Sequence, residues 1–184
     1  MGQLRSQLHF ARFGPRGWYS EEERTLHCLT AIDLKGNRLW QAGEPYQGEH
    51  PYCSHGSKGF AVADLDGDGF PEVLSIDWDV LKVYDGRTGE LKARKQLPAD
   101  NFAQVLIGLL KGDSKRPQVL VKVNSMSYPP YSYGNPTIML DSDLSELWTQ
   151  DFYGGGHNPV FIDVDGDGCN ELLIGYNAFG RPEN

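Results

Sequence analysis

The sequence contains no apolar run of about 18 residues, so no stretch is long enough for a membrane-spanning helix. It also lacks a long amphipathic helical pattern. Gly, Pro, Asp and Asn interrupt the chain every ~8–12 residues, which predicts all-β structure. Arg and Lys are outnumbered by Asp and Glu, 17 to 25, and form no basic patch. Nucleic acid is therefore not expected as a partner.

Cysteine is scarce, and its spacing matches no zinc or redox motif. We expect Cys28, Cys53 and Cys169 to be small buried or loop residues, with one disulfide left open as an alternative. Residues 1–17 lack the apolar middle region of a secretory signal peptide. The sequence also has no nucleophile elbow, Gly-rich phosphate loop or Cys–His pair, so no catalytic residue is predicted. The 184 residues are enough for one domain of ordinary size.

The most informative feature is a nine-residue motif, D-x-D-G-D-G-x-x-E, that occurs at 64–72 and again at 163–171. Carboxylates at alternating positions of a Gly-containing turn are typical of Ca²⁺ ligands. The motif is not an EF-hand, because it lacks the bidentate Glu at position 12 and is flanked by short, strand-like apolar runs. The alternative is a pair of acidic hairpins without metal, in which the carboxylates would repel one another.

We therefore predict two Ca²⁺ sites, each in a loop between two buried strands. The expected ligands are the side chains at positions 1, 3 and 5, the backbone carbonyl at position 7, and the Glu at position 9, which ligates directly or through water. In the first loop these residues are Asp64, Asp66, Asp68, Phe70 and Glu72, and in the second loop they are Asp163, Asp165, Asp167, Cys169 and Glu171. Two bound Ca²⁺ ions would halve the formal net charge of −8.

A second motif, a hairpin with an Asp at its turn, recurs at 28–43, 80–95 and 136–151. The aligned Asp33, Asp85 and Asp141 lie 52 and 56 residues apart. Seven residues after each Asp stand Trp40, Lys92 and Trp148. Hairpin and acidic loop together form a repeat of about 50 residues with four strands, which predicts a β-propeller blade.

The predicted blades divide the chain into a partial blade at 1–45, blades at 57–98 and 103–151, and a half blade at 157–178. About three and a half blades do not close a ring. We expect a segment of a larger propeller, or self-association that completes the ring. Between the two acidic loops, 107–121 aligns as a degraded copy. Lys115, Arg116 and Gln118 stand there where ligands would be, so this middle loop is predicted to bind no Ca²⁺.

These repeats resemble the integrin-α-like propellers that contain FG-GAP and VCBS calcium repeats. The resemblance rests on GFAVADLDGDGFPEVLSI, HNPVFIDVDGDGCNELLIGY and the hairpins ending in GNRLW and LSELW. More remotely, the chain is similar to rhamnogalacturonan lyases and related secreted propellers. That family implies an eight-bladed, calcium-stabilised propeller that cleaves pectin backbones by β-elimination, and an extracellular or cell-surface location. No catalytic motif of that family is matched residue by residue.

Two functions follow as hypotheses: a structural or carbohydrate-binding calcium module, or part of a polysaccharide lyase-like enzyme. The partner would be a polysaccharide or another protein. Ligand-contact candidates are a proline-stiffened tyrosine loop, a histidine after three glycines, and a tryptophan after the first acidic loop. These candidates are Tyr128, Tyr131, Tyr133, His157 and Trp78. The alternatives remain open, namely a loop packed on its own propeller and a plain turn residue at His157.

Overall fold

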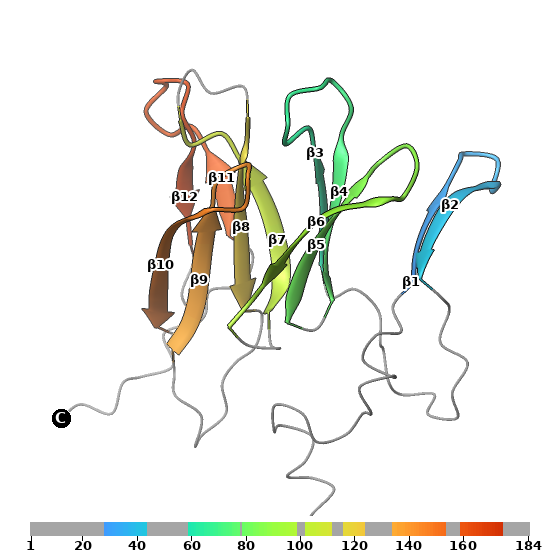
Figure 1. The fold of residues 1–184 in the computed structure, drawn as a ribbon. Coiled ribbons are helices and arrows are strands. Elements are labelled where there is room, and N and C mark those ends of the chain that lie inside the picture. Colours follow the sequence, from blue (N-terminus) through green and yellow to red (C-terminus); the bar gives the residue numbers. More distant parts are fainter. Residues whose placement is uncertain are drawn as a thin grey trace, which may run out of the picture.

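In the computed structural model, the described residues are 28–43, 59–77, 79–98, 102–111, 116–123, 134–153 and 159–174. Within them the chain forms twelve β-strands and no helix (Figure 1). The strands are β1 (Cys28–Ile32), β2 (Arg38–Gly43), β3 (Phe60–Ala63), β4 (Glu72–Asp77), β5 (Val80–Asp85), β6 (Leu91–Gln96), β7 (Phe102–Gly108), β8 (Gln118–Val123), β9 (Gly134–Leu140), β10 (Glu146–Tyr153), β11 (Val160–Ile162) and β12 (Glu171–Leu173). The all-β expectation is confirmed. None of the described residues belongs to a helix that is long and apolar enough to cross a membrane.

The strands form two four-stranded antiparallel sheets, β3-β4-β5-β6 and β7-β8-β9-β10, and two hairpins, β1-β2 and β11-β12. Each four-stranded sheet is a meander in chain order, and the sheets lie beside one another in Figure 1. Strand β7 contacts β3 and β4 on one side and β11 on the other. The described sheets do not close into a ring, so the propeller and its blade boundaries stay predictions.

The core lies around the central strands of the two large sheets. Leu74 and Ile76 on β4, Val119 and Val121 on β8, and Leu140 on β9 are fully buried. Strands β4 and β8 are buried along almost their whole length, and this burial includes polar side chains such as Ser75 on β4 and Lys122 on β8. The hydrophobic packing therefore supports the strand ends from which the loops project.

The three aligned hairpin aspartates each accept backbone N–H groups of their own turn. Asp33 Oδ1 accepts the backbone N–H groups of Lys35 and Asn37, both at 2.8 Å. Asp85 Oδ1 accepts those of Arg87 and Thr88, and Asp141 Oδ1 accepts that of Ser142 at 2.9 Å. The carboxylates of Asp33 and Asp85 thus close their turns, as short acidic side chains do, whereas that of Asp141 bonds no backbone N–H of the described residues beyond the adjacent Ser142.

Two aromatic rings, each packed against a glycine of the next sheet, connect neighbouring sheets. Trp40 on β2 lies against the β5–β6 turn, where a Cβ at Gly89 would be 2.6 Å from the indole ring. Phe161 on β11 lies against β7, where a Cβ at Gly108 would be 2.5 Å from the phenyl ring. These glycines let a ring approach the backbone of the next sheet.

Candidate metal loops

The first acidic loop connects β3 to β4. Ala63 and Glu72 are register partners, so the loop starts and ends at adjacent points of the sheet. Gly67 and Gly69 have φ angles of 78° and 88°, a region that side chains disfavour. The two glycines therefore let the backbone turn tightly between alternating aspartates.

Side-chain oxygens of the loop accept its own backbone N–H groups. Asp64 accepts Gly67 N–H with Oδ1 at 2.7 Å and Gly69 N–H with Oδ2 at 2.9 Å. The loop is closed from its far end, because Glu72 Oε2 accepts Leu65 N–H at 2.8 Å. The carboxyl of Glu72 is buried, whereas Asp66 is exposed. These contacts orient the carboxylates of Asp64 and Glu72.

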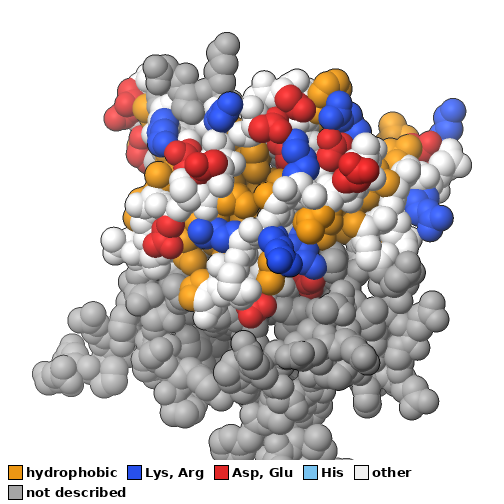
Figure 2. Space-filling model, in the orientation of Figure 1, with side chains coloured by type: hydrophobic (Ala, Val, Ile, Leu, Met, Phe, Trp, Pro, Cys, Tyr) orange, Lys and Arg blue, Asp and Glu red, His pale blue; other side chains and the backbone are white. Residues whose placement is uncertain are grey.

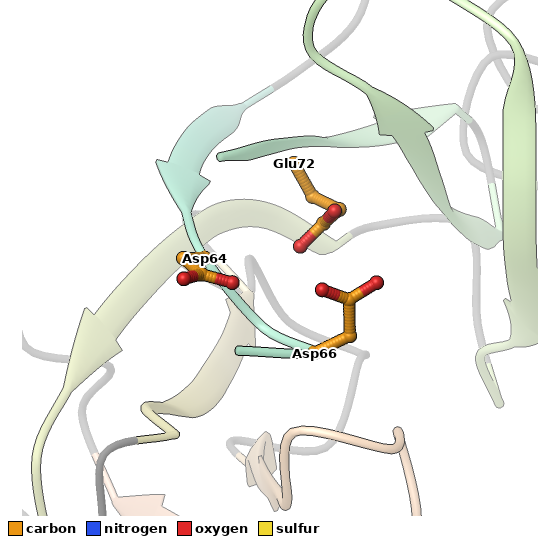
Figure 3. A group of neighbouring side chains, drawn as sticks. All are labelled: Asp64, Asp66 and Glu72. Carbon is orange, nitrogen blue, oxygen red and sulfur yellow. The ribbon is translucent and has the colours of Figure 1, made fainter. Parts of the chain in front are cut away.

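The carboxyl groups of Asp64, Asp66 and Glu72 point toward one space, with one oxygen of each within 4.8 Å of the others (Figure 3). Asp68, also a predicted ligand, does not join this group. Its Oδ1 instead accepts Phe70 N–H at 2.8 Å, and its Oδ2 lies 3.9 Å from Arg87 Nη2. The structure thus gathers the carboxylates of positions 1, 3 and 9.

The second loop, between β11 and β12, repeats this geometry bond for bond. Asp163 accepts the N–H groups of Gly166 at 2.6 Å and Gly168 at 3.0 Å. Glu171 Oε2 accepts Val164 N–H at 2.9 Å. Asp163, Asp165 and Glu171 form the equivalent three-carboxylate group. Asp167 again stays outside and accepts Cys169 N–H at 2.7 Å.

The middle repeat keeps the closing hydrogen bond without the carboxylate. Gln118, at the start of β8, corresponds to Glu72 and Glu171, and its Oε1 accepts Leu110 N–H at 2.9 Å. Its amide Nε2 donates to Arg116 O and to Asp141 Oδ1, at 3.1 and 3.2 Å. The side chain at this position therefore closes the loop in all three repeats. In Glu72 and Glu171, unlike Gln118, the second oxygen remains an anionic acceptor.

Basic side chains surround the first loop. Lys92 Nζ on β6 lies 2.6 Å from both Asp66 Oδ2 and Glu72 Oε1. These contacts raise the pKa of Lys92, Asp66 contributing most, and the same hydrogen bond lowers the pKa of Asp66. Arg87 lies over the Phe70 ring at 4.0 Å from its centroid. Figure 2 shows acidic and basic side chains next to each other on this part of the surface.

The donor set of each group suits a hard divalent cation. All three ligands are carboxylates, which Ca²⁺ prefers, and ligand oxygens on opposite sides of one Ca²⁺ are about 4.6–5.2 Å apart. Separations within 4.8 Å fit that geometry. Both groups can thus hold a metal ion, and the chemistry of the ligands favours Ca²⁺ or Mg²⁺ over softer metals.

The other predicted contacts are the five ligand-contact candidates. All five lie outside the described residues, namely Tyr128, Tyr131, Tyr133, His157 and Trp78. Cys28 and Cys169 are half-buried, and Cys53 lies outside the described residues. The sequence does not identify Lys92 as a partner of the first loop. Its one signal is a charged residue where the aligned hairpins carry Trp40 and Trp148.

No protein-family profile matches the chain. Among characterised proteins, the chain is similar to the rhamnogalacturonan endolyase YesW of Bacillus subtilis (strain 168), with 27% identity over 208 residues. The match covers 82% of this chain and 32% of that protein, so the chain spans about a third of its relative. The similarity indicates a remote relation to that family. The integrin-α-like resemblance and the extracellular location stay predictions.

Proposed function

We propose that the chain is a calcium-stabilised β-sheet module of a polysaccharide-recognising protein related to rhamnogalacturonan lyases. The observation that carries the calcium part is the identical set of hydrogen bonds in the two loops. With these hydrogen bonds in place, three carboxylates converge in each loop. Without a counter-ion such groups repel one another, and a bound cation converts that repulsion into attraction. Calcium would be structural and would fix the loops between strands.

The polysaccharide part rests on the similarity to YesW, whose name gives rhamnogalacturonan as its substrate. Contacts between β7 and the first strands of both neighbouring sheets, β3 and β11, are consistent with radially arranged propeller blades. A lyase activity is the second candidate. Because the chain spans about a third of its relative, at 32%, we treat it first as a binding module.

The test is thermal unfolding of the purified chain in EDTA and in millimolar Ca²⁺, with Mg²⁺ as the control ion. At a free Ca²⁺ concentration about 100 times Kd, one site adds about 2.7 kcal/mol, which raises the melting temperature by several degrees. An unchanged melting temperature in a cooperatively folding protein would overturn the calcium proposal. Binding to rhamnogalacturonan without release of unsaturated products would favour the module, and release of such products would favour the lyase.

A further inference from the structure

The first acidic loop already contains a cation from the chain itself. The ammonium of Lys92 lies 2.6 Å from Asp66 Oδ2 and 2.6 Å from Glu72 Oε1. Both carboxylates belong to the three-carboxylate group of this loop. The Glu72 side chain is only 3% exposed, so its contact with Lys92 is largely shielded from water. Two arginines are also close, since Arg87 Nη2 lies 3.9 Å from Asp68 and a Cβ at Gly67 would be 3.7 Å from Arg116 Nε.

The second loop has the same backbone geometry but a different electrostatic environment. Among the residues that the structure describes, no Lys or Arg forms an ion pair with Asp163, Asp165 or Glu171. Glu171 Oε2 closes the loop on Val164 N–H, as Glu72 Oε2 does on Leu65 N–H. The two loops therefore agree in shape and, within the described part of the chain, differ in their ion pairs.

We propose that Lys92 is a tethered competitor for the metal, so that the first loop binds a divalent cation more weakly than it would without this ammonium. This inference rests on the proposed calcium function. A cation that enters the first loop must displace the ammonium from Asp66 and Glu72. In return, the ammonium neutralises the first loop when no metal is bound, so this loop keeps its shape at low Ca²⁺.

The position of Lys92 in the repeat supports this role. Trp40 stands seven residues after Asp33, as Lys92 does after Asp85, and its ring packs on the turn of the next sheet. Lys92 instead extends along its own sheet, from β6 to the loop between β3 and β4. At equivalent hairpin positions, Trp40 thus makes an inter-sheet contact, whereas Lys92 contacts the acidic loop of its own sheet.

The experiment measures Ca²⁺ binding by titration calorimetry, one loop at a time. Asp165→Asn isolates the first loop and Asp66→Asn isolates the second. In the Asp165→Asn background, Lys92→Met should lower the Kd of the first loop roughly tenfold. This exceeds the effect of an exposed ion pair because the Glu72 carboxylate is buried. Lys92→Trp, which restores the residue of the aligned hairpins, should act in the same direction.

The matched control is Lys95→Met, which removes the same charge from the same strand but from a residue that forms no ion pair with the described loop. It should leave the Kd within about twofold, because an exposed charge that forms no ion pair with the loop is largely screened by salt. An unchanged or higher Kd in both Lys92 variants would overturn the inference and leave the calcium proposal intact. If neither isolated loop binds Ca²⁺, the calcium proposal itself fails, and this inference fails with it.

Discussion

The indole Nε1 of Trp40 donates a 2.8 Å hydrogen bond to the backbone carbonyl of Gly86. The two residues are 46 positions apart, and they join the β1-β2 hairpin to the turn between β5 and β6. The indole ring covers Gly89 of the same turn. One buried tryptophan therefore fixes the position of a hairpin whose other side chains are mostly exposed.

Replacing Gly89 by Ala should destabilise the protein through this contact. The new Cβ would lie 2.6 Å from the Trp40 ring, and φ at Gly89 is 74°. Gly36→Ala is the matched control, because Gly36 has φ 84° in the aligned turn and nothing within 4 Å of the Cβ position. Backbone strain alone costs about 1–2 kcal/mol, and overpacking adds about 1–3 kcal/mol. Chemical denaturation should therefore give a clearly lower free energy of unfolding for Gly89→Ala than for Gly36→Ala. Equal losses of stability in the two variants would argue against the Trp40 contact.

Much of the local structure can be predicted from the sequence, because it depends on neighbours in the chain. The strands around both acidic loops follow from apolar runs, and the turns follow from Asp and Gly at fixed spacing. Asp33 and Asp85 close their turns as the aligned motif suggests. Leu144 does not fit such a rule, since it adopts φ 66° where the first aligned turn has Gly36. Its side chain is 8% exposed in the core, and burial offsets the backbone strain.

The environment of the candidate site depends on the fold and is harder to predict. The motif contains four carboxylates per loop, and spacing does not tell which of them converge. Asp68 accepts the N–H of Phe70, and the spacing of the metal-binding motif does not predict this hydrogen bond. Lys92 reaches Glu72 across 20 residues, because the meander returns β6 toward the loop. Long-range pairings of this kind leave almost no signal in a single sequence.

Glu171→Gln should separate loop closure from metal binding. Gln118 already closes the middle loop with its amide oxygen, so the amide introduced in place of Glu171 should accept the same hydrogen bond from Val164 N–H. The melting temperature in EDTA should stay near that of the wild type. The Ca²⁺-dependent increase from the second loop should be lost, because one anionic ligand is gone.

The companion variant Glu171→Ala removes both functions of the side chain. In EDTA it should be less stable than Glu171→Gln by about 1 kcal/mol, the contribution of one ordinary hydrogen bond. A Glu171→Gln protein that still responds to Ca²⁺ like the wild type would show that Glu171 is not a ligand. Thermal unfolding of the three proteins, each with EDTA and with Ca²⁺, provides the comparison.

Asp141 should make stability depend on pH in the acid range. Hydrogen bonds from Lys111, which contributes most, and from Ser142 and Gln118 lower the pKa of Asp141 from 3.8 to about 2. Because the folded pKa lies below the unfolded value, this contribution is fully present above about pH 4 and is lost as the pH falls toward about 2. Asp141→Asn should therefore destabilise the protein more at about pH 5 than at about pH 2.5 in urea denaturation.

Lys111→Met tests the cause of that pH dependence, since it removes the main partner of Asp141 and leaves the carboxyl in place. The pKa of Asp141 should then move back toward 3.8, and the acid loss of stability should shift to higher pH. An Asp141→Asn effect of equal size at both pH values would mean that Asp141 acts through the turn geometry alone. In that case the neutral amide would fail to replace the carboxylate as acceptor of Ser142 N–H, and the charge of Asp141 would not contribute to stability.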